Sequence, residues 1–366
     1  MKRNALSLAA ALLVLGSIAP AHADDFLDAA KKKVAVATAP ADKWDGPTAG
    51  PKAVAGKTVV FVAADMKNGG IVGASKGVEE AAKVIGWTVR VIDGQGTVSG
   101  RTAAMNQALA LKPAGIVVGG FDVTEQKTAF AAAAKSAIPL VGWHAGEKPG
   151  PNDKVGLYAN ITTATDDVAD VAASWAVADS GGKAGVVIFT DSQYAIAVYK
   201  ARAMEAVIKK CGGCTVLSFE DSPIAESSTR MPQLTTALLQ RFGDKWTHSL
   251  AINDLYFDFM GPSLGAAGKK GDGSPKAVSA GDGSEAAYQR IRSKRYQSGT
   301  VPEPLNMQGW QIVDELNRAF SKAPWSGYVP KVHLVTPDNV GKDGGPNNVF
   351  DPDNGYRNEY KKIWGK

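Results

Sequence analysis

The sequence contains little cysteine and histidine, with two Cys and four His among 366 residues. Cys211 and Cys214 form one Cys-x-x-Cys pair, and no second pair of Cys or His follows at the spacing of a zinc site. The metalloprotease motif His-Glu-x-x-His is also missing. The sequence therefore predicts a protein that is not an enzyme and that uses no metal ion or other cofactor.

The position of the two cysteines separates two further interpretations. They follow the helix-like stretch "VYKARAMEAVIKK" and precede a strand-like stretch, so they are expected at the C-terminal end of a helix. A redox-active Cys-x-x-Cys needs its first cysteine at a helix N-terminus, where the dipole stabilises the thiolate. We therefore favour a structural Cys211–Cys214 disulfide, formed in an oxidising compartment, over a catalytic pair.

Long apolar runs are confined to the N-terminus. A basic start, Lys2-Arg3, precedes an apolar run over residues 5–18, and Ala21-His22-Ala23 is a small-x-small cleavage site. This pattern predicts a signal peptide removed after Ala23 and a mature protein in the periplasm. No cysteine follows the run, which argues against a lipid anchor, and no later run is long enough to span a bilayer.

The sequence also lacks a strong excess of charge of one sign. The formal net charge is +5, and no dense Lys/Arg face stands out, so nucleic acid binding is not expected. Hydrophobic residues make up 45% and charged residues 21%, which is typical of a soluble globular protein. The length predicts two domains.

Short apolar stretches alternate with Ala-rich stretches of helical length from Gly56 onward. This alternation predicts an α/β fold with parallel sheets and right-handed crossovers. The strand-like stretches of the first half are "TVVFVAA", "TVRVID", "GIVVGG" and "IPLVGW". Before them, residues 24–55 form a leader, with a helix-like part and a tether rich in Pro and Gly.

The same plan starts again about 126 residues later. "GKTVVFVAAD" at Gly56 matches "GKAGVVIFTD" at Gly182, and the closing Asp falls at Asp65 and at Asp191. Each copy continues with a helix, a turn and a strand. The sequence therefore predicts two similar, doubly wound lobes.

Polar and aromatic side chains follow the ends of the predicted strands. Ligands of doubly wound sheets bind beyond the carboxyl ends of the strands, so these side chains are candidate ligand contacts. Lys67 is the one cationic side chain close to them in the sequence. Carboxylates, amides and aromatic rings without cations suit a neutral, hydroxyl-rich ligand. The candidates are Asp65, Asn68, Asp122, Trp143, His144, Tyr194, Asn253, Asp282 and Glu303.

The turn "KNGGIVGASKG" does not match either glycine-rich motif that binds phosphate. It lacks Gly-x-x-x-x-Gly-Lys-Ser/Thr and Gly-x-Gly-x-x-Gly. Two interpretations remain open: Gly69 and Gly70 only shape the turn, or the turn is one lip of a binding cleft.

The order and spacing of these segments resemble type I periplasmic binding proteins, in particular the ribose- and galactose-binding subunits of bacterial ABC sugar importers. The resemblance covers about residues 56–336 and rests on segments including "KTVVFVAADMKNGG", "IPLVGWH", "AINDLYFDFM", "SAGDGSEAAYQRI" and "TVPEPLNMQGWQIVDELNRAF". It implies two lobes joined by a hinge of three crossing strands, with ligand bound between them. The implied lobes are residues 56–158 plus 306–332 and residues 159–305 plus 333–366.

The resemblance also implies that some residues of this sequence contact the ligand. Asn68, Asn253 and Asp282 match ligand-binding residues of the family, and Glu303 stands where ribose binders have an amide. Hydrogen bonding to sugar hydroxyls is the role implied for them.

Other positions depart from the family pattern. Gly70 and Ile71 replace paired phenylalanines, His144-Ala145 replaces an Asp-Arg pair, and an arginine expected after "VVIFTD" is absent, with Tyr194 nearby. These departures argue against ribose and favour another sugar or a polyol, held between Trp143 and Tyr194.

The resemblance implies a monomeric periplasmic protein that delivers this ligand to the permease subunits of an ABC importer. The alternative is a sensory protein that binds an autoinducer or nucleoside and signals to a membrane receptor, and the sequence does not separate the two. A repressor of the same fold is disfavoured by the signal peptide.

Overall fold

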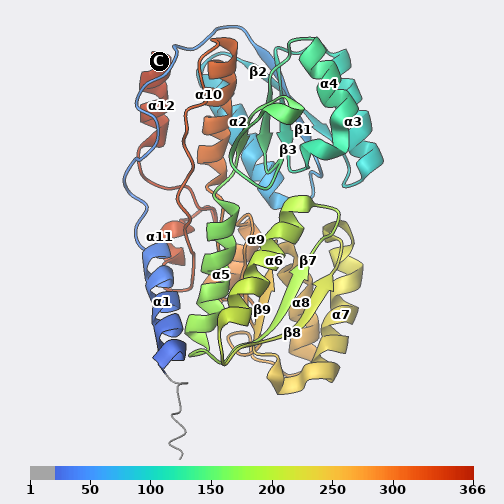
Figure 1. Cartoon of the computed structure of the whole chain (residues 1–366), viewed down its shortest axis with the longest axis vertical. Helices are drawn as coiled ribbons and strands as arrows, with labels where there is room; N and C mark the ends of the chain where they lie inside the picture. The colour runs from blue at the N-terminus through green and yellow to red at the C-terminus, as the bar shows by residue number, and fades with distance from the viewer. Residues whose placement is uncertain (1–20) are drawn as a thin grey trace, which may run out of the picture.

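The computed structural model describes residues 21–366, with side chains from residue 24 onward. The predicted signal peptide of residues 1–23 lies outside the described residues, except for Ala21–Ala23, which form the start of helix α1. The chain builds two α/β lobes, one above the other (Figure 1). None of the helices in the described part is both long and apolar enough to cross a membrane.

The first lobe contains a six-stranded sheet in the order β2-β1-β3-β4-β6-β5. All neighbours are parallel except β5, which pairs antiparallel with β6. The strands are β1 (Thr58–Ala63), β2 (Thr88–Asp93), β3 (Gly115–Gly119), β4 (Leu140–Trp143), β5 (Gly150–Asn152) and β6 (Leu157–Ile161). The helices are α2 (Gly69–Val84), α3 (Val98–Ala110), α4 (Lys127–Lys135), α10 (Leu305–Phe320) and α12 (Tyr356–Trp364).

The second lobe contains a five-stranded parallel sheet in the order β8-β7-β9-β10-β11. The strands are β7 (Gly185–Thr190), β8 (Thr215–Asp221), β9 (His248–Ala251), β10 (Lys276–Ser279) and β11 (Gly299–Thr300). The helices are α1 (Ala21–Ala37), α5 (Thr165–Asp179), α6 (Ala195–Lys210), α7 (Ser227–Phe242), α8 (Leu255–Ala266), α9 (Glu285–Ser293) and the short α11 (Val340–Asp343).

The two sheets repeat one topology, which confirms the predicted pair of similar lobes. The order β2-β1-β3-β4-β6 in one corresponds to β8-β7-β9-β10-β11 in the other. The central strands β3 and β7 are buried at every residue because helices cover both faces of each sheet. Continuous apolar runs such as "GVVIFT" are the sequence signature of such strands.

The repeat extends to the turns at the strand ends. Asp65 accepts a hydrogen bond from the N–H of Lys67, and Asp191 accepts one from the N–H of Gln193, each at 2.9 Å. A short carboxylate that accepts a bond from the backbone two residues later stabilises a tight turn. The two matched aspartates therefore build the same turn in both lobes.

Helix α10 and helix α2 pack with unusually close backbones. An added Cβ at Gly309 would lie 2.3 Å from the carbonyl carbon of Gly77. Two glycines at one crossing let the helix axes approach where larger residues would separate them. This crossing fixes α10 on the first lobe, directly after the chain leaves the second.

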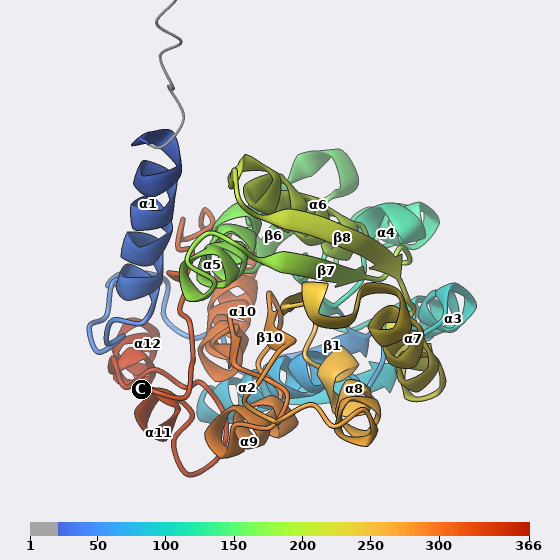
Figure 2. The same ribbon diagram turned by 90° about the horizontal axis from the view of Figure 1, so that it is seen from below.

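The leader contacts both lobes. Helix α1 packs on α5 of the second lobe (Figure 2), with Ala30 and Ala37 in that lobe's core. Residues 44–54 then lie on the first lobe, where Trp44 packs between Tyr328 and Tyr360, with ring centroids at 5.2 and 5.4 Å. The leader therefore crosses between the lobes.

The C-terminal helix α12 differs from the lobe assignment made from the sequence. Residues 333–366 are predicted in the second lobe, but Tyr356, Tyr360 and Trp364 belong to the core of the first. Trp364 stacks on Trp310 of α10 at 5.4 Å and donates to Asp314 at 2.8 Å. The apolar face of α12 and this indole N–H find their partners on α10, so the last segment crosses back to the first lobe.

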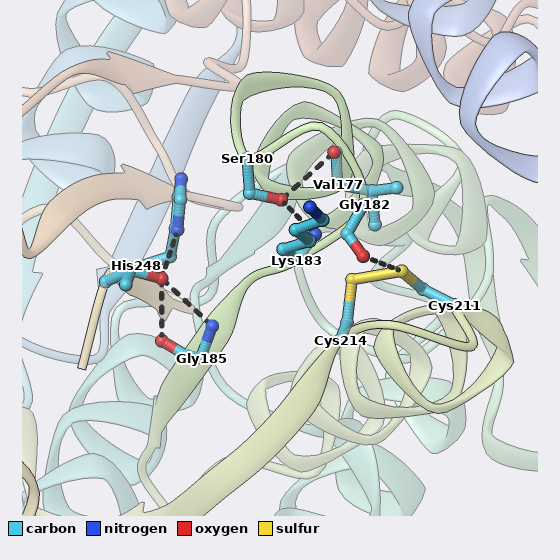
Figure 3. The surroundings of a disulfide bond; sticks show 9 residues. Val177, Ser180, Gly182, Lys183, Gly185, Cys211, Cys214 and His248 are labelled. Atoms are coloured by element: carbon cyan, nitrogen blue, oxygen red, sulfur yellow. Dashed lines mark hydrogen bonds between the residues drawn. A yellow bond between two sulfur atoms is a disulfide. The ribbon is translucent and has the colours of Figure 1, made fainter. Parts of the chain in front are cut away.

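The disulfide predicted between Cys211 and Cys214 is confirmed. It joins the end of α6 to the start of β8 (Figure 3), and the sulfur of Cys211 lies 3.4 Å from the carbonyl oxygen of Gly182. The described residues contain no free cysteine. The bridge closes a tight helix-to-strand turn of the second lobe.

Candidate functional site

One small cavity lies between the lobes, at the carboxyl ends of both sheets. Its volume is about 50 Å³. Asn68 and Gly120 reach it from the ends of β1 and β3, and Tyr194 and Asn253 from the ends of β7 and β9. In both sheets the strand order reverses between these two strands, which is where doubly wound folds bind ligands. The complete lining is Asn68, Ile71, Gly120, Trp143, His144, Tyr194, Ile196, Ala197, Lys200, Ile224, Ile252, Asn253 and Asp282.

The lobes touch each other beside this cavity. An added Cβ at Gly70 of the first lobe would lie 2.4 Å from the carboxyl group of Asp282 in the second. An added Cβ at the neighbouring Gly69 would lie 3.1 Å from the Cβ of Ser284. Side chains at these two positions would hold the lobes apart, so the glycines shape the turn and also form a lip of the cleft.

Asn68 and Asn253 are fixed by their own helices and turns. The Oδ1 of Asn68 accepts hydrogen bonds from the N–H groups of Gly70 and Ile71, at 2.9 and 3.3 Å, and so caps α2. Asn253 donates to Asp282 at 2.8 Å and accepts from the N–H of Leu255. Both amides are therefore held rigidly in the cavity wall.

His144 links the two lobes at the base of the cavity. Its Nδ1 lies 3.8 Å from Oδ1 of Asp282, and its Nε2 lies 3.1 Å from Oε1 of Glu303, although that contact is not aligned as a hydrogen bond. Its ring stacks on Trp143 with centroids 4.0 Å apart. The imidazole therefore covers one face of the indole that was expected to stack on a ligand.

Glu303 lies behind His144 and ties the site to the connections between the lobes. Its Oε2 accepts a hydrogen bond from the N–H of Thr163, in the segment after β6, and another from Gln308 of α10. Gln308 in turn accepts from the indole N–H of Trp143 at 2.7 Å. These hydrogen bonds therefore connect the segments that join the two lobes to the side chains at the base of the cavity.

The pKa values of Asp282 and Glu303 shift in opposite directions. Burial raises the pKa of Asp282, and the nearby charges of His144 and Lys200 only partly offset it. Burial also acts to raise the pKa of Glu303, but the charge and the hydrogen-bonding capacity of His144, with Lys200 and Thr163, lower it to about 2. Glu303 lies closer to His144 and accepts more bonds, which explains why the two directions differ.

Tyr194 closes the cavity from the second lobe. The guanidinium carbon of Arg101, on α3 of the first lobe, lies 5.4 Å from the centre of its ring. Arg101 is completely buried and is paired with Glu125 at 2.7 Å. Burial raises the pKa of the Tyr194 hydroxyl to about 12, so it remains a hydrogen-bond donor at neutral pH.

Six of the nine residues predicted as ligand contacts line the cavity: Asn68, Trp143, His144, Tyr194, Asn253 and Asp282. Glu303 contacts His144 but does not line it. Asp65 and Asp122 lie outside the lining, and each accepts a backbone N–H two residues later, from Lys67 and Thr124. Their position after a strand reflects turn formation, so we leave these two out of the binding site.

Lys200 was not among the predicted residues, and it changes the electrostatic description of the site. Its side chain is 4% exposed, lines the cavity, and donates to the carbonyl oxygen of Ala280 at 2.8 Å. The expectation that Lys67 is the one cation near the site is therefore wrong. A signal was present, because Lys200 shares the buried face of α6 with Ala197, Ala201 and Met204.

The described residues contain no group of three or more His, Cys, Asp or Glu side chains that could hold a metal ion. The cavity instead combines apolar walls, formed largely by isoleucines and Trp143, with a few buried polar groups. Such a lining suits a small organic ligand that has both C–H surface and hydrogen-bonding groups.

Comparison with known families supports this description. A model of the family "Periplasmic binding protein domain" matches residues 59–323. A search of curated protein sequences gives no significant match.

Three solved structures illustrate the structural likeness. A galactofuranose binding protein is 15% identical, with a TM-score of 0.68 over 85% of this chain and 99% of its own. The periplasmic component of the arabinose ABC transporter from Shewanella sp. ANA-3 is 15% identical, with a TM-score of 0.67 over 84% and 95%. A solute binding protein from Agrobacterium vitis, bound with α-D-tagatopyranose, is 14% identical, with a TM-score of 0.71 over 81% and 99%. At these identities the likeness establishes the fold.

Proposed function

The chain belongs to the periplasmic binding protein family, and from this premise we propose that it captures a neutral sugar or polyol between its lobes and delivers it to an ABC importer. The observation that carries the proposal is the convergence of polar side chains from both lobes on one cavity between them. Several solved proteins of this fold are described as binding galactofuranose, arabinofuranose, tagatopyranose or myo-inositol, which places sugars and cyclitols first among the candidates.

The chemistry of the cavity favours a polyhydroxy ligand. Asp282 accepts hydrogen bonds and Lys200 donates them, so a hydroxyl group, which does both, can pair with each. The isoleucine side chains of the lining can cover the C–H faces of a ring. A hydroxyl or carboxylate left unpaired in such a closed site costs about 1–3 kcal/mol, and this penalty is the basis of selectivity.

Capture requires that the lobes separate and close. The lobes meet beside the cavity of about 50 Å³, where Gly70 lies close to Asp282. We propose a hinge at the segments that join them, with the closed form recognised by permease subunits. The mature protein is expected in the periplasm after cleavage of the signal peptide, and we assign it no catalytic step.

Calorimetric titration tests the proposed binding. D-galactose, L-arabinose, D-ribose, D-tagatose and myo-inositol form a suitable first panel, applied to protein that has been unfolded and refolded to remove any bound ligand. At least one member is expected to bind. The absence of binding across a full panel of pentoses, hexoses and polyols would overturn the proposal.

Two aspartates provide a matched pair of variants for the same titration. Asp282→Asn is expected to weaken binding about 10- to 100-fold, because an amide donates where the ligand hydroxyl needs an acceptor. Asp122→Asn lies outside the cavity and keeps a side chain able to cap its turn, so it should leave affinity unchanged. Equal affinities for the two variants would contradict the assignment of the cavity as the site.

A further inference from the structure

Lys200 is a buried cation that forms no direct ion pair, although its charge acts on the nearby Asp282 and Glu303. It sits in the middle of α6 with 4% of its surface exposed. Among residues 24–366, no carboxylate oxygen lies within the 4.0 Å of an ion pair from its Nζ. A buried charge without a direct ion pair is costly to a folded protein, so its presence calls for an explanation.

The hydrogen bonds of Lys200 are also incomplete. An ammonium group has three N–H donors. In the described part of the chain, Nζ has one acceptor, the carbonyl oxygen of Ala280 at 2.8 Å. Two donors are therefore left for the cavity that the side chain lines.

Asp282 is the complementary group in the same wall. It follows Ala280 by two residues, and it accepts a hydrogen bond from Asn253 through Oδ2. Its Oδ1 faces His144 at 3.8 Å, too far for a hydrogen bond. Lys200 and Asp282 line one cavity but do not form an ion pair, so each has unused capacity directed at the same space.

We propose that Lys200 and Asp282 together hold one hydroxyl group of the ligand, which accepts a hydrogen bond from the ammonium group and donates one to the carboxylate. This inference rests on the proposed function and specifies the group that it selects. Donor and acceptor act on a single oxygen, so the pair rejects a ligand that lacks this hydroxyl. Lys200 is thus a specificity-determining residue and not a structural one.

The test combines Lys200→Met with deoxy sugars. Met keeps an unbranched side chain that is one atom shorter and removes all three donors. For the member of the sugar panel that wild type binds most tightly, each monodeoxy derivative is titrated against both proteins. One derivative is expected to bind wild type about 10- to 100-fold more weakly than its parent, while Lys200→Met binds the parent and this derivative with similar affinity.

Lys210→Met is the matched control. Lys210 is the last residue of α6 and is exposed, so its removal should leave both affinities unchanged. If Lys200→Met keeps the discrimination of wild type against every deoxy derivative, the inference is overturned. Such a result would leave sugar binding itself established.

Thermal unfolding of the ligand-free proteins gives a second, independent readout. Removing an unpaired buried charge is expected to keep or raise the unfolding midpoint of Lys200→Met, whereas loss of a structural residue lowers it. If no sugar binds wild type, the proposed function fails and this measurement alone decides the role of Lys200. A lowered midpoint then overturns the inference, and an unchanged or raised midpoint supports a ligand-directed ammonium group.

Discussion

Glu315 is an acid buried completely in the first lobe, on helix α10. Its carboxyl group accepts hydrogen bonds from the backbone N–H of Ser326 at 3.2 Å and from the hydroxyl of the same residue. Burial raises its pKa to about 8, with a further contribution from the negative charge of Asp314. Near neutral pH, Glu315 is therefore mostly protonated in the folded protein and ionised in the unfolded chain.

This difference predicts a pH-dependent stability. Because the folded pKa is raised, the folded state holds a proton that the unfolded state releases, so the free energy of unfolding falls as pH rises between about 4.5 and 8. Glu315→Gln mimics the protonated acid and should remove this fall. The free energy of unfolding of the variant should match that of wild type near pH 4.5 and should exceed it by roughly a few kcal/mol at pH 8.

Urea unfolding of both proteins at a series of pH values measures this effect. Glu359→Gln, on the more exposed helix α12, serves as a control that keeps the wild-type profile. If the unfolding free energies of wild type and Glu315→Gln change in parallel with pH, the buried acid does not titrate in this range.

Single residues of the site differ in how well the sequence predicts them. Asn68, Asn253 and Asp282 lie in the segments between a strand and the next helix, so topology alone places them at the cavity. Asp65 also follows a strand, but its carboxylate is used by its own turn, and such local bonding cannot be told from ligand binding in a sequence. Lys200 was missed because a lysine in a helix is usually solvated.

At the scale of elements, the crossing of α2 and α10 depends on two glycines. Gly309→Ala would place a methyl carbon 2.3 Å from the backbone of Gly77, and neither helix backbone can yield locally. We expect the variant to lose about 1–3 kcal/mol of unfolding free energy, despite the better helix propensity of alanine. Denaturant unfolding measures the change.

Gly341→Ala, in helix α11, is the matched control, because nothing lies within 4 Å of its added Cβ. It should change stability by less than about 0.5 kcal/mol. If the two variants are equally stable, the close approach of α2 and α10 does not contribute to stability.

The strands of both sheets are largely predictable, and the exceptions have a physical reason. Continuous Val- and Ile-rich runs such as β1 and β7 are buried on both faces and are recognised by composition alone. Strands β5 and β6 were not predicted. The sequence of β5, Gly-Pro-Asn, has a low strand propensity, and β5 forms only as an antiparallel edge on β6.

At the scale of the whole molecule, the leader attaches to both lobes. The first lobe holds it through Trp44 and through hydrogen bonds of its backbone, from Ala53 N to the carbonyl oxygen of Trp364 and from Val54 N to Asn317. Trp44→Ala should loosen this attachment without changing ligand affinity, since Trp44 does not line the cavity.

Hydrogen exchange at the amides of Ala53 and Val54 tests this attachment. Loss of a half-buried indole, about 1–3 kcal/mol, should speed their exchange roughly 5- to 100-fold. Val36→Ala, at an exposed position of α1, should leave both amides protected. Unchanged protection in Trp44→Ala would mean that other contacts hold the leader.

The sequence predicts two lobes but not which lobe carries the terminal segments. The apolar face of α12 gives no indication of which core it joins; contacts such as the stacking of Trp364 on Trp310, with its bond to Asp314, select the first. Such long-range pairings leave no local pattern. The predicted division at residue 333 therefore fails for the last helix.

Because α1 packs on the second lobe and α12 on the first, the two ends of the described chain are attached to different lobes. Any rotation about the proposed hinge must change the separation of these two helices. Fluorophores attached to their outer faces would thus convert ligand capture into an optical signal, with no dye placed near the sugar.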